Sequence, residues 1–159
     1  MNAPKPDLSP FRLRARSFLS QGRVDDAMGL FDDVIAVDPQ DAAAYADRGT
    51  AFAMQKQFDL AMLDLDRAFA LGYGDASAYS TAGTIALETR QYEKALGYFA
   101  KAVELDPAYP FTYFNRANVY YALGKREAAI ADLNTCLSFD SAADFRQLVA
   151  KRLAAIQNG

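Results

Sequence analysis

The sequence predicts an all-α protein built from repeated pairs of antiparallel helices. The first observation is an interval of 34 residues at which residues of one kind recur in the same phase. The aromatic members of this series are Phe11, Tyr45, Tyr79 and Tyr113, and the small members are Ala27, Ala61, Ala95 and Ala129. The second observation is that apolar residues within one interval follow three- and four-residue steps, as on one face of an α-helix. A helical pattern that repeats at this interval indicates a stack of similar helical units.

Capping and turn residues divide the chain into these units. Asp41 and Asp75 are suited to the N-cap of a helix, and Pro110 is suited to a first helical turn. Turn residues are expected between the two helices of each pair at Gly22, Lys56, Arg90 and Gly124. The spacing between these turn and cap residues leaves room for two helices of roughly 13 residues in each unit. The predicted units are residues 8–41, 42–75, 76–109 and 110–141, preceded by an extended arm at 1–7.

This repeat resembles the tetratricopeptide repeat (TPR) family. The most typical stretch is TYFNRANVYYALGKREAAIADL, from Thr112 to Leu133. The sequence departs from the family pattern at Tyr73 and Ser141, where proline is usual, and at Arg126, where an aromatic residue is usual. The resemblance implies a right-handed α-solenoid, or superhelix, whose concave groove is lined by the first helix of each pair.

The C-terminal segment 142–159 is expected to form one more helix that caps the array. Its apolar residues are Phe145, Leu148, Val149, Leu153 and Ile156. These residues do not continue the repeat phase, so the segment is not a fifth repeat. Stacked repeats need a polar outer face at their ends, which favours a cap. A helix that binds a partner is the alternative.

Paired charges at a fixed offset predict salt bridges inside two of the helix pairs. Arg48 stands sixteen residues before Asp64, and Arg116 stands sixteen residues before Asp132. The third unit has neither charge at these two places. Arg14 has no aspartate at this offset, so we expect it to find Asp32, Asp33 or solvent.

Helical geometry assigns one side of each first helix to the concave groove. The predicted groove is basic in the first unit, lined by small residues in the middle and aromatic in the fourth unit. Aromatic anchors dominate binding energy at many protein interfaces, and an asparagine can hold a peptide bond by its donor and its acceptor. The predicted peptide-binding residues are Arg12, Arg16, Thr50, Thr84, Phe111, Phe114, Asn118 and Tyr121. The alternative for Phe111 and Tyr121 is that both pack against the C-terminal helix.

Composition excludes several classes of function. The chain of 159 residues contains no histidine, which removes histidine bases and histidine metal ligands. Its net charge of −3 argues against nucleic-acid binding, and Cys136 is the one cysteine, as expected in a reducing compartment. We find neither a paired carboxylate site nor a phosphate-binding loop. We therefore expect no enzyme activity, cofactor or bound metal, a cytoplasmic location and no membrane association.

The leading interpretation is an adaptor that binds a peptide segment of a protein partner in the groove. The alternative is a dedicated chaperone, similar to the TPR-type chaperones of bacterial type III secretion. Recognition of chaperone C-termini through a carboxylate clamp is not expected, because Asp47 stands at one clamp position and would repel a carboxylate. The proline-rich arm, with Leu8 beside it, is a candidate occupant of a neighbouring molecule's groove, which would give a weak homo-oligomer.

Overall fold

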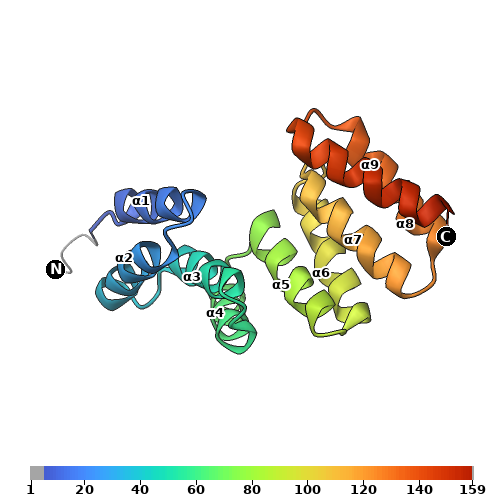
Figure 1. The fold of residues 1–159 in the computed structure, drawn as a ribbon. Helices are drawn as coiled ribbons and strands as arrows, with labels where there is room; N and C mark the ends of the chain where they lie inside the picture. The colour runs from blue at the N-terminus through green and yellow to red at the C-terminus, as the bar shows by residue number, and fades with distance from the viewer. Residues whose placement is uncertain (1–5, 159) are drawn as a thin grey trace. The chain divides into compact units, whose positions relative to one another are not determined.

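The computed structural model describes residues 6–158, and within this range the chain forms nine α-helices (Figure 1). The chain divides into two compact units, Met1–Gly74 and Asp75–Gly159. The helices of the first unit are α1 (Ser9–Ser20), α2 (Val24–Val37), α3 (Ala42–Met54) and α4 (Phe58–Ala70). Those of the second are α5 (Ala76–Glu88), α6 (Tyr92–Leu105), α7 (Pro110–Ala122), α8 (Arg126–Ser138) and α9 (Ala143–Asn158). The prediction of an all-α fold of helix pairs is confirmed.

The predicted helix caps are present. The carboxylate of Asp41 accepts a hydrogen bond from the backbone N–H of Ala44, and Asp75 does the same for Ala78. Pro110 is the first residue of α7, where its missing N–H costs no helical hydrogen bond. These residues satisfy or avoid the unpaired donors that every helix start exposes, so they fix where the first helices begin.

Each pair turns through one residue in the left-handed region of backbone space. Glycine serves at two of these turns, with φ of 74° at Gly22 and 71° at Gly124. Lys56 and Arg90 hold the same conformation at φ of 58° and 59°, although their side chains make it less favourable. The four turns predicted from sequence are therefore the points where the chain reverses inside each pair.

Close packing inside each pair depends on small residues. Gly83 of α5 faces the buried ring of Phe99 in α6 so closely that a Cβ atom there would lie 2.6 Å from a ring carbon. Gly49 of α3 has a similar position against the backbone oxygen of Ala61, at 3.0 Å from such a Cβ atom. The small residues of the 34-residue series thus permit the two helices of a pair to approach each other.

Both predicted salt bridges are present. Arg48 bonds Asp64 through Nε at 2.7 Å and Nη2 at 2.9 Å, and also bonds Asp32 of α2 at 2.7 Å. Arg116 bonds Asp132 through the same two nitrogens at 2.7 and 2.8 Å. In both cases the aspartate is buried, and the paired carboxylate raises the pKa of the arginine above its ordinary value.

Three partners were expected for Arg14, namely Asp32, Asp33 or solvent, and its side chain is exposed, as the solvent alternative requires. The carboxylate of Asp32 is bonded by Arg48 of the next pair, which reaches it from α3. The guanidinium carbon of Arg14 lies 5.5 Å from the centre of the Phe18 ring instead, within the range of a cation–π contact.

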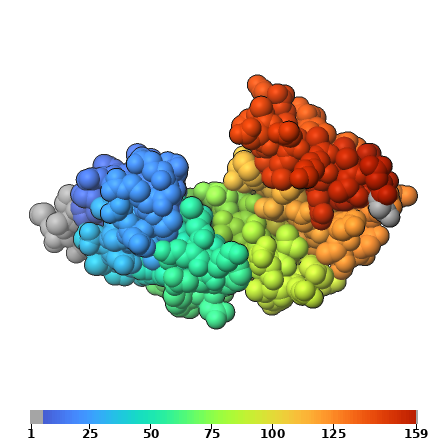
Figure 2. Space-filling view, viewed as in Figure 1, coloured from blue at the N-terminus to red at the C-terminus, as the bar shows by residue number. Residues whose placement is uncertain are grey.

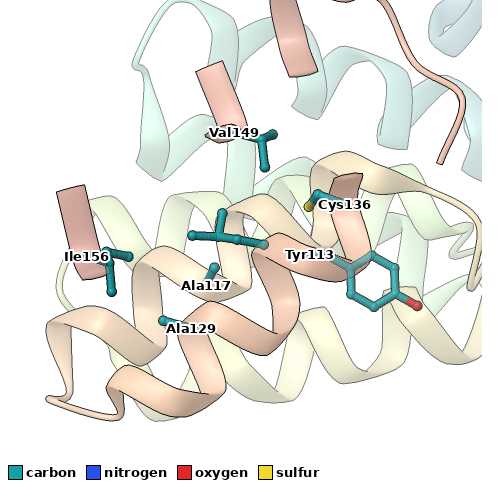
Figure 3. Close-up of a cluster of buried hydrophobic side chains, with 7 residues drawn as sticks. Tyr113, Ala117, Ala129, Cys136, Val149 and Ile156 are labelled. Carbon is teal, nitrogen blue, oxygen red and sulfur yellow. The ribbon is translucent and has the colours of Figure 1, made fainter. Parts of the chain in front are cut away.

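The helix α9 caps the second unit. Val149 and Ile156 are buried with Tyr113, Ala117 and other residues of α7 and α8 (Figure 3). In the space-filling view the red atoms of α9 lie directly on the orange atoms of the preceding pair (Figure 2). Leu148 is outside this buried face, because half of its surface is exposed.

Arg126 explains one departure from the family pattern. Its Nη2 donates a hydrogen bond of 2.5 Å to the backbone oxygen of Gln157, close to the end of α9. A cation is favourable at the carboxyl end of a helix, where carbonyl groups lack partners. The arginine that replaces an aromatic residue therefore helps to hold the cap.

The predicted extended arm is described only at its end. Residues 1–5 of the arm lie outside the described residues, and Pro6 to Leu8 are not helical. Pro10 lies in the first turn of α1, so the proline-rich stretch does not remain extended as far as this residue. Between residues 6 and 158, no helix is long and apolar enough to cross a membrane.

Candidate peptide-binding surface

The two arginines predicted for the groove lie together on α1 beside a pocket. The pocket has a volume of about 300 Å³, and its lining includes Arg12, Arg16, Ala43 of α3 and Tyr73. Arg12 bonds Asp41 at 3.0 Å and Arg16 bonds Asp47 at 2.8 Å. This surface of the first unit therefore carries two ion pairs instead of two free cations.

Asp47 has a different role from the one inferred from sequence. Its carboxylate pairs with Arg16, and this bond raises the pKa of the arginine. Its negative charge is thus largely balanced within the first unit. The pairing was not visible in the sequence, although the two residues are separated by nearly one repeat.

The two predicted threonines bond their own helices. The hydroxyl of Thr50 donates to the carbonyl of Ala46 at 3.1 Å, and that of Thr84 donates to Ser80 at 2.9 Å. Thr84 also accepts a hydrogen bond of 3.1 Å from the amide nitrogen of Asn115 in α7. This contact joins successive first helices at the offset of 31 residues that also separates Arg16 from Asp47.

The predicted aromatic residues of α7 pack against α9. The ring of Phe111 lies 4.4 Å from that of Phe145, and the ring of Phe114 lies 5.7 Å from it in an edge-on arrangement. Tyr109 extends the cluster at 5.6 Å from Phe111. Phe111 nevertheless keeps 47% of its surface exposed, so the cluster is also an apolar surface open to solvent.

Asn118 and Tyr121 meet the other end of α9. The side-chain oxygen of Asn118 accepts a hydrogen bond of 2.9 Å from Nε of Arg152. The guanidinium carbon of Arg152 lies 4.7 Å from the centre of the Tyr121 ring, and Tyr121 is 44% exposed. The structure thus brings all four predicted residues of the fourth repeat together along one face of α7.

The contribution of α9 to this surface was missed by the sequence analysis. Phe145, Leu148 and Arg152 stand 34 residues after Phe111, Phe114 and Asn118, so the expectation that the apolar residues of this segment leave the repeat phase is wrong for Phe145 and Leu148. We name the surface formed by these six residues and Tyr121 the α7–α9 face. The repeat interval itself was the signal that could have found its second half.

Groups with other chemistry do not gather on this face. Cys136 is buried, and burial raises the pKa of its thiol to about 12, so the thiolate nucleophile is suppressed. Among the residues that the structure describes, no three cysteine, aspartate or glutamate side chains are grouped as metal ligands. The α7–α9 face combines apolar area with an amide and a guanidinium, which are groups that bind peptides.

Comparison with known families and structures agrees with the fold. Tetratricopeptide repeat models match residues 12–70 and 112–142, and a TPR repeat model matches residues 83–124. One similar structure is YrrB, described as a TPR protein with an unusual peptide-binding site. It shares 18% identity with a TM-score of 0.72, over 96% of this chain and 77% of that chain.

Two further structures show the same fold. The pilF protein of Pseudomonas aeruginosa has 20% identity and a TM-score of 0.81, over 95% of this chain and 68% of that chain. The first TPR domain of Spaghetti, bound to an HSP90 peptide, has 21% identity and a TM-score of 0.66, over 78% of this chain and 98% of that chain. TPR proteins are generally non-catalytic modules of protein–protein interaction. The family matches span most of this chain, which is therefore a member of the tetratricopeptide repeat family with a C-terminal capping helix.

Proposed function

We propose that this protein is a non-catalytic adaptor that binds a peptide segment of a partner protein along the first helices of its repeats. The observation that carries the proposal is the exposure of large aromatic side chains on the α7–α9 face. Phe111 and Tyr121 each keep nearly half of their surface open, and Leu148 on the same face is equally exposed. Exposed aromatic groups beside polar donors are the usual anchors of protein interfaces.

The first unit offers a second candidate contact, which is polar. Its pocket of about 300 Å³ on α1 is lined in part by Tyr73, Arg12 and Arg16, and both arginines are held in ion pairs with aspartates. A pocket of this size is suited to one or two side chains of a peptide and is small for a typical cofactor. We assign it to a second segment of the partner.

Selection of peptides from a random displayed library against the full chain tests the proposal. We expect selected peptides to lose binding when Phe111 is changed to serine. The matched control is Leu63→Ser on α4, because Leu63 is also a large exposed apolar residue, 67% open, and lies on a second helix of a pair.

Three outcomes are informative. Loss of binding in Phe111→Ser alone supports the proposal, provided that the thermal midpoint shows α9 still folded. Loss in Leu63→Ser alone means that the second helices bind and contradicts it. Purification with one unstable client that aggregates without this protein would instead indicate the dedicated chaperone.

A further inference from the structure

Arg152 differs from the other partly buried arginines in its partners. Arg12, Arg48 and Arg116 each bond an aspartate. Arg152 bonds the neutral oxygen of Asn118, and no carboxylate within residues 6–158 pairs with it. A guanidinium that is partly removed from water without a counter-ion is a ready site for an anion.

The guanidinium of Arg152 is also held in one orientation. Its Nε is fixed by the hydrogen bond to Asn118, and its plane is supported by the ring of Tyr121 at 4.7 Å. Its two terminal nitrogens, Nη1 and Nη2, are not buried, so a ligand can reach them from solution. These two nitrogens form the planar fork that matches the two oxygens of a carboxylate.

We propose that Arg152 binds an acidic side chain of the partner's peptide, while Phe111 and Leu148 hold an apolar side chain of the same segment. The choice of an acidic peptide follows from charge, because Arg152 is the one charged side chain among the seven residues of the α7–α9 face. This inference rests on the proposed peptide-binding function and names the chemistry of the peptide.

The geometry of α9 sets the spacing of the two side chains. Leu148 and Arg152 are four residues apart on one helix, which is about 6 Å along the axis. Two residues of an extended peptide span about 7 Å, and side chains two positions apart point to the same side. We therefore expect the acidic residue two positions from the apolar one. The exposed Asp144 repels a carboxylate at the other end of α9 and so favours binding at Arg152.

An array of short capped peptides tests the inference. Each peptide carries one leucine and one glutamate separated by zero to four residues in a serine–glycine background, with acetyl and amide ends. A twin of each peptide carries glutamine in place of glutamate. We expect the full chain to bind the glutamate peptide about tenfold or more tightly than its twin, most strongly with one intervening residue. The preference is expected to weaken as salt is raised.

Two variants separate the anion site from the stability of the cap. Asn118→Asp places a carboxylate 2.9 Å from Arg152 as an internal counter-ion, which keeps α9 docked and removes the preference for glutamate. Arg152→Gln removes the site directly. The control is Arg146→Gln, which changes the same charge at an exposed position of α9 and is expected to retain the preference.

The outcomes distinguish this inference from the proposed function. Equal binding of the glutamate and glutamine peptides overturns the acidic specificity and leaves peptide binding intact. A glutamate preference that survives in Asn118→Asp at an unchanged thermal midpoint overturns the role of Arg152. Absence of binding to every array peptide also contradicts the inference, while the random library, which demands no acidic residue, decides the proposed function separately.

Discussion

Replacement of Gly83 by alanine is the sharpest test of how the two helices of a pair approach each other. The added Cβ would lie 2.6, 2.8 and 2.9 Å from three ring carbons of Phe99. That ring is fully buried, so it cannot move aside without disturbing its neighbours. Overpacking of this kind costs about 1–3 kcal/mol, whereas the better helix propensity of alanine returns about 1 kcal/mol. The expected net change is a loss of about 0–2 kcal/mol of the free energy of unfolding, which is about 1–3 kcal/mol less favourable than the change in propensity alone.

Gly97 provides the matched control on the partner helix. An added Cβ there meets no atom within 4 Å, so only the better helix propensity of alanine changes the free energy of unfolding. We expect Gly97→Ala to be neutral or to stabilise the protein by up to about 1 kcal/mol. Urea unfolding followed by circular dichroism measures both variants under one condition. If Gly83→Ala proves as stable as Gly97→Ala, the close approach of α5 and α6 is wrong.

Three further predictions concern buried polar groups of the second unit. Thr112→Val should stabilise the protein by about 1 kcal/mol in chemical unfolding, because the fully buried Thr112 hydroxyl has no hydrogen-bond partner; a loss of stability would refute this. Asp132→Asn should cost about 2–3 kcal/mol by the same assay, because the partly buried Arg116 then loses its bonded carboxylate, and an unchanged midpoint would contradict the energetic importance of the pair. Cys136 should not react with a disulfide reagent at pH 8 in the folded protein, since its pKa is raised from 9.0 to about 12. Because the folded state holds this proton more tightly than the unfolded state, the thiol's contribution to stability should be lost progressively as pH rises above about 9; rapid labelling at pH 8 would show that the thiol is accessible.

The sequence predicted the repeated fold because its signals are local. Asp41 and Asp75 each accept a hydrogen bond from a backbone N–H three residues later, in the first turn of the helix that they cap. Gly22 and Gly124 adopt positive φ angles, which a residue without a side chain adopts readily. The Arg116–Asp132 bond was also predictable, because both residues belong to one helix pair with a fixed offset. Such features need no knowledge of how one repeat packs on the next.

Contacts between successive repeats were harder to predict. The pairing of Arg16 with Asp47 depends on the exact approach of two first helices, and the contact of Arg152 with Asn118 depends on the approach of the cap α9 to α7. Several charged partners are within reach of a long arginine side chain, and the interval alone does not choose among them. The partner of Arg14 stayed open among Asp32, Asp33 and solvent for this reason, and the sequence did not show that Arg48 bonds Asp32.

The outer side of α9 has a consequence for how the array can grow. Gln147 and Lys151 occupy the places that Tyr113 and Ala117 hold in α7, where the first helix meets its own second helix. A helix added against this side of α9 would have to take the ammonium group of Lys151 out of water without a prepared partner, which is strongly unfavourable. The exposed Lys151 therefore disfavours the packing of another helix pair on this side of α9, much as a charged residue at a sheet edge prevents another strand from joining.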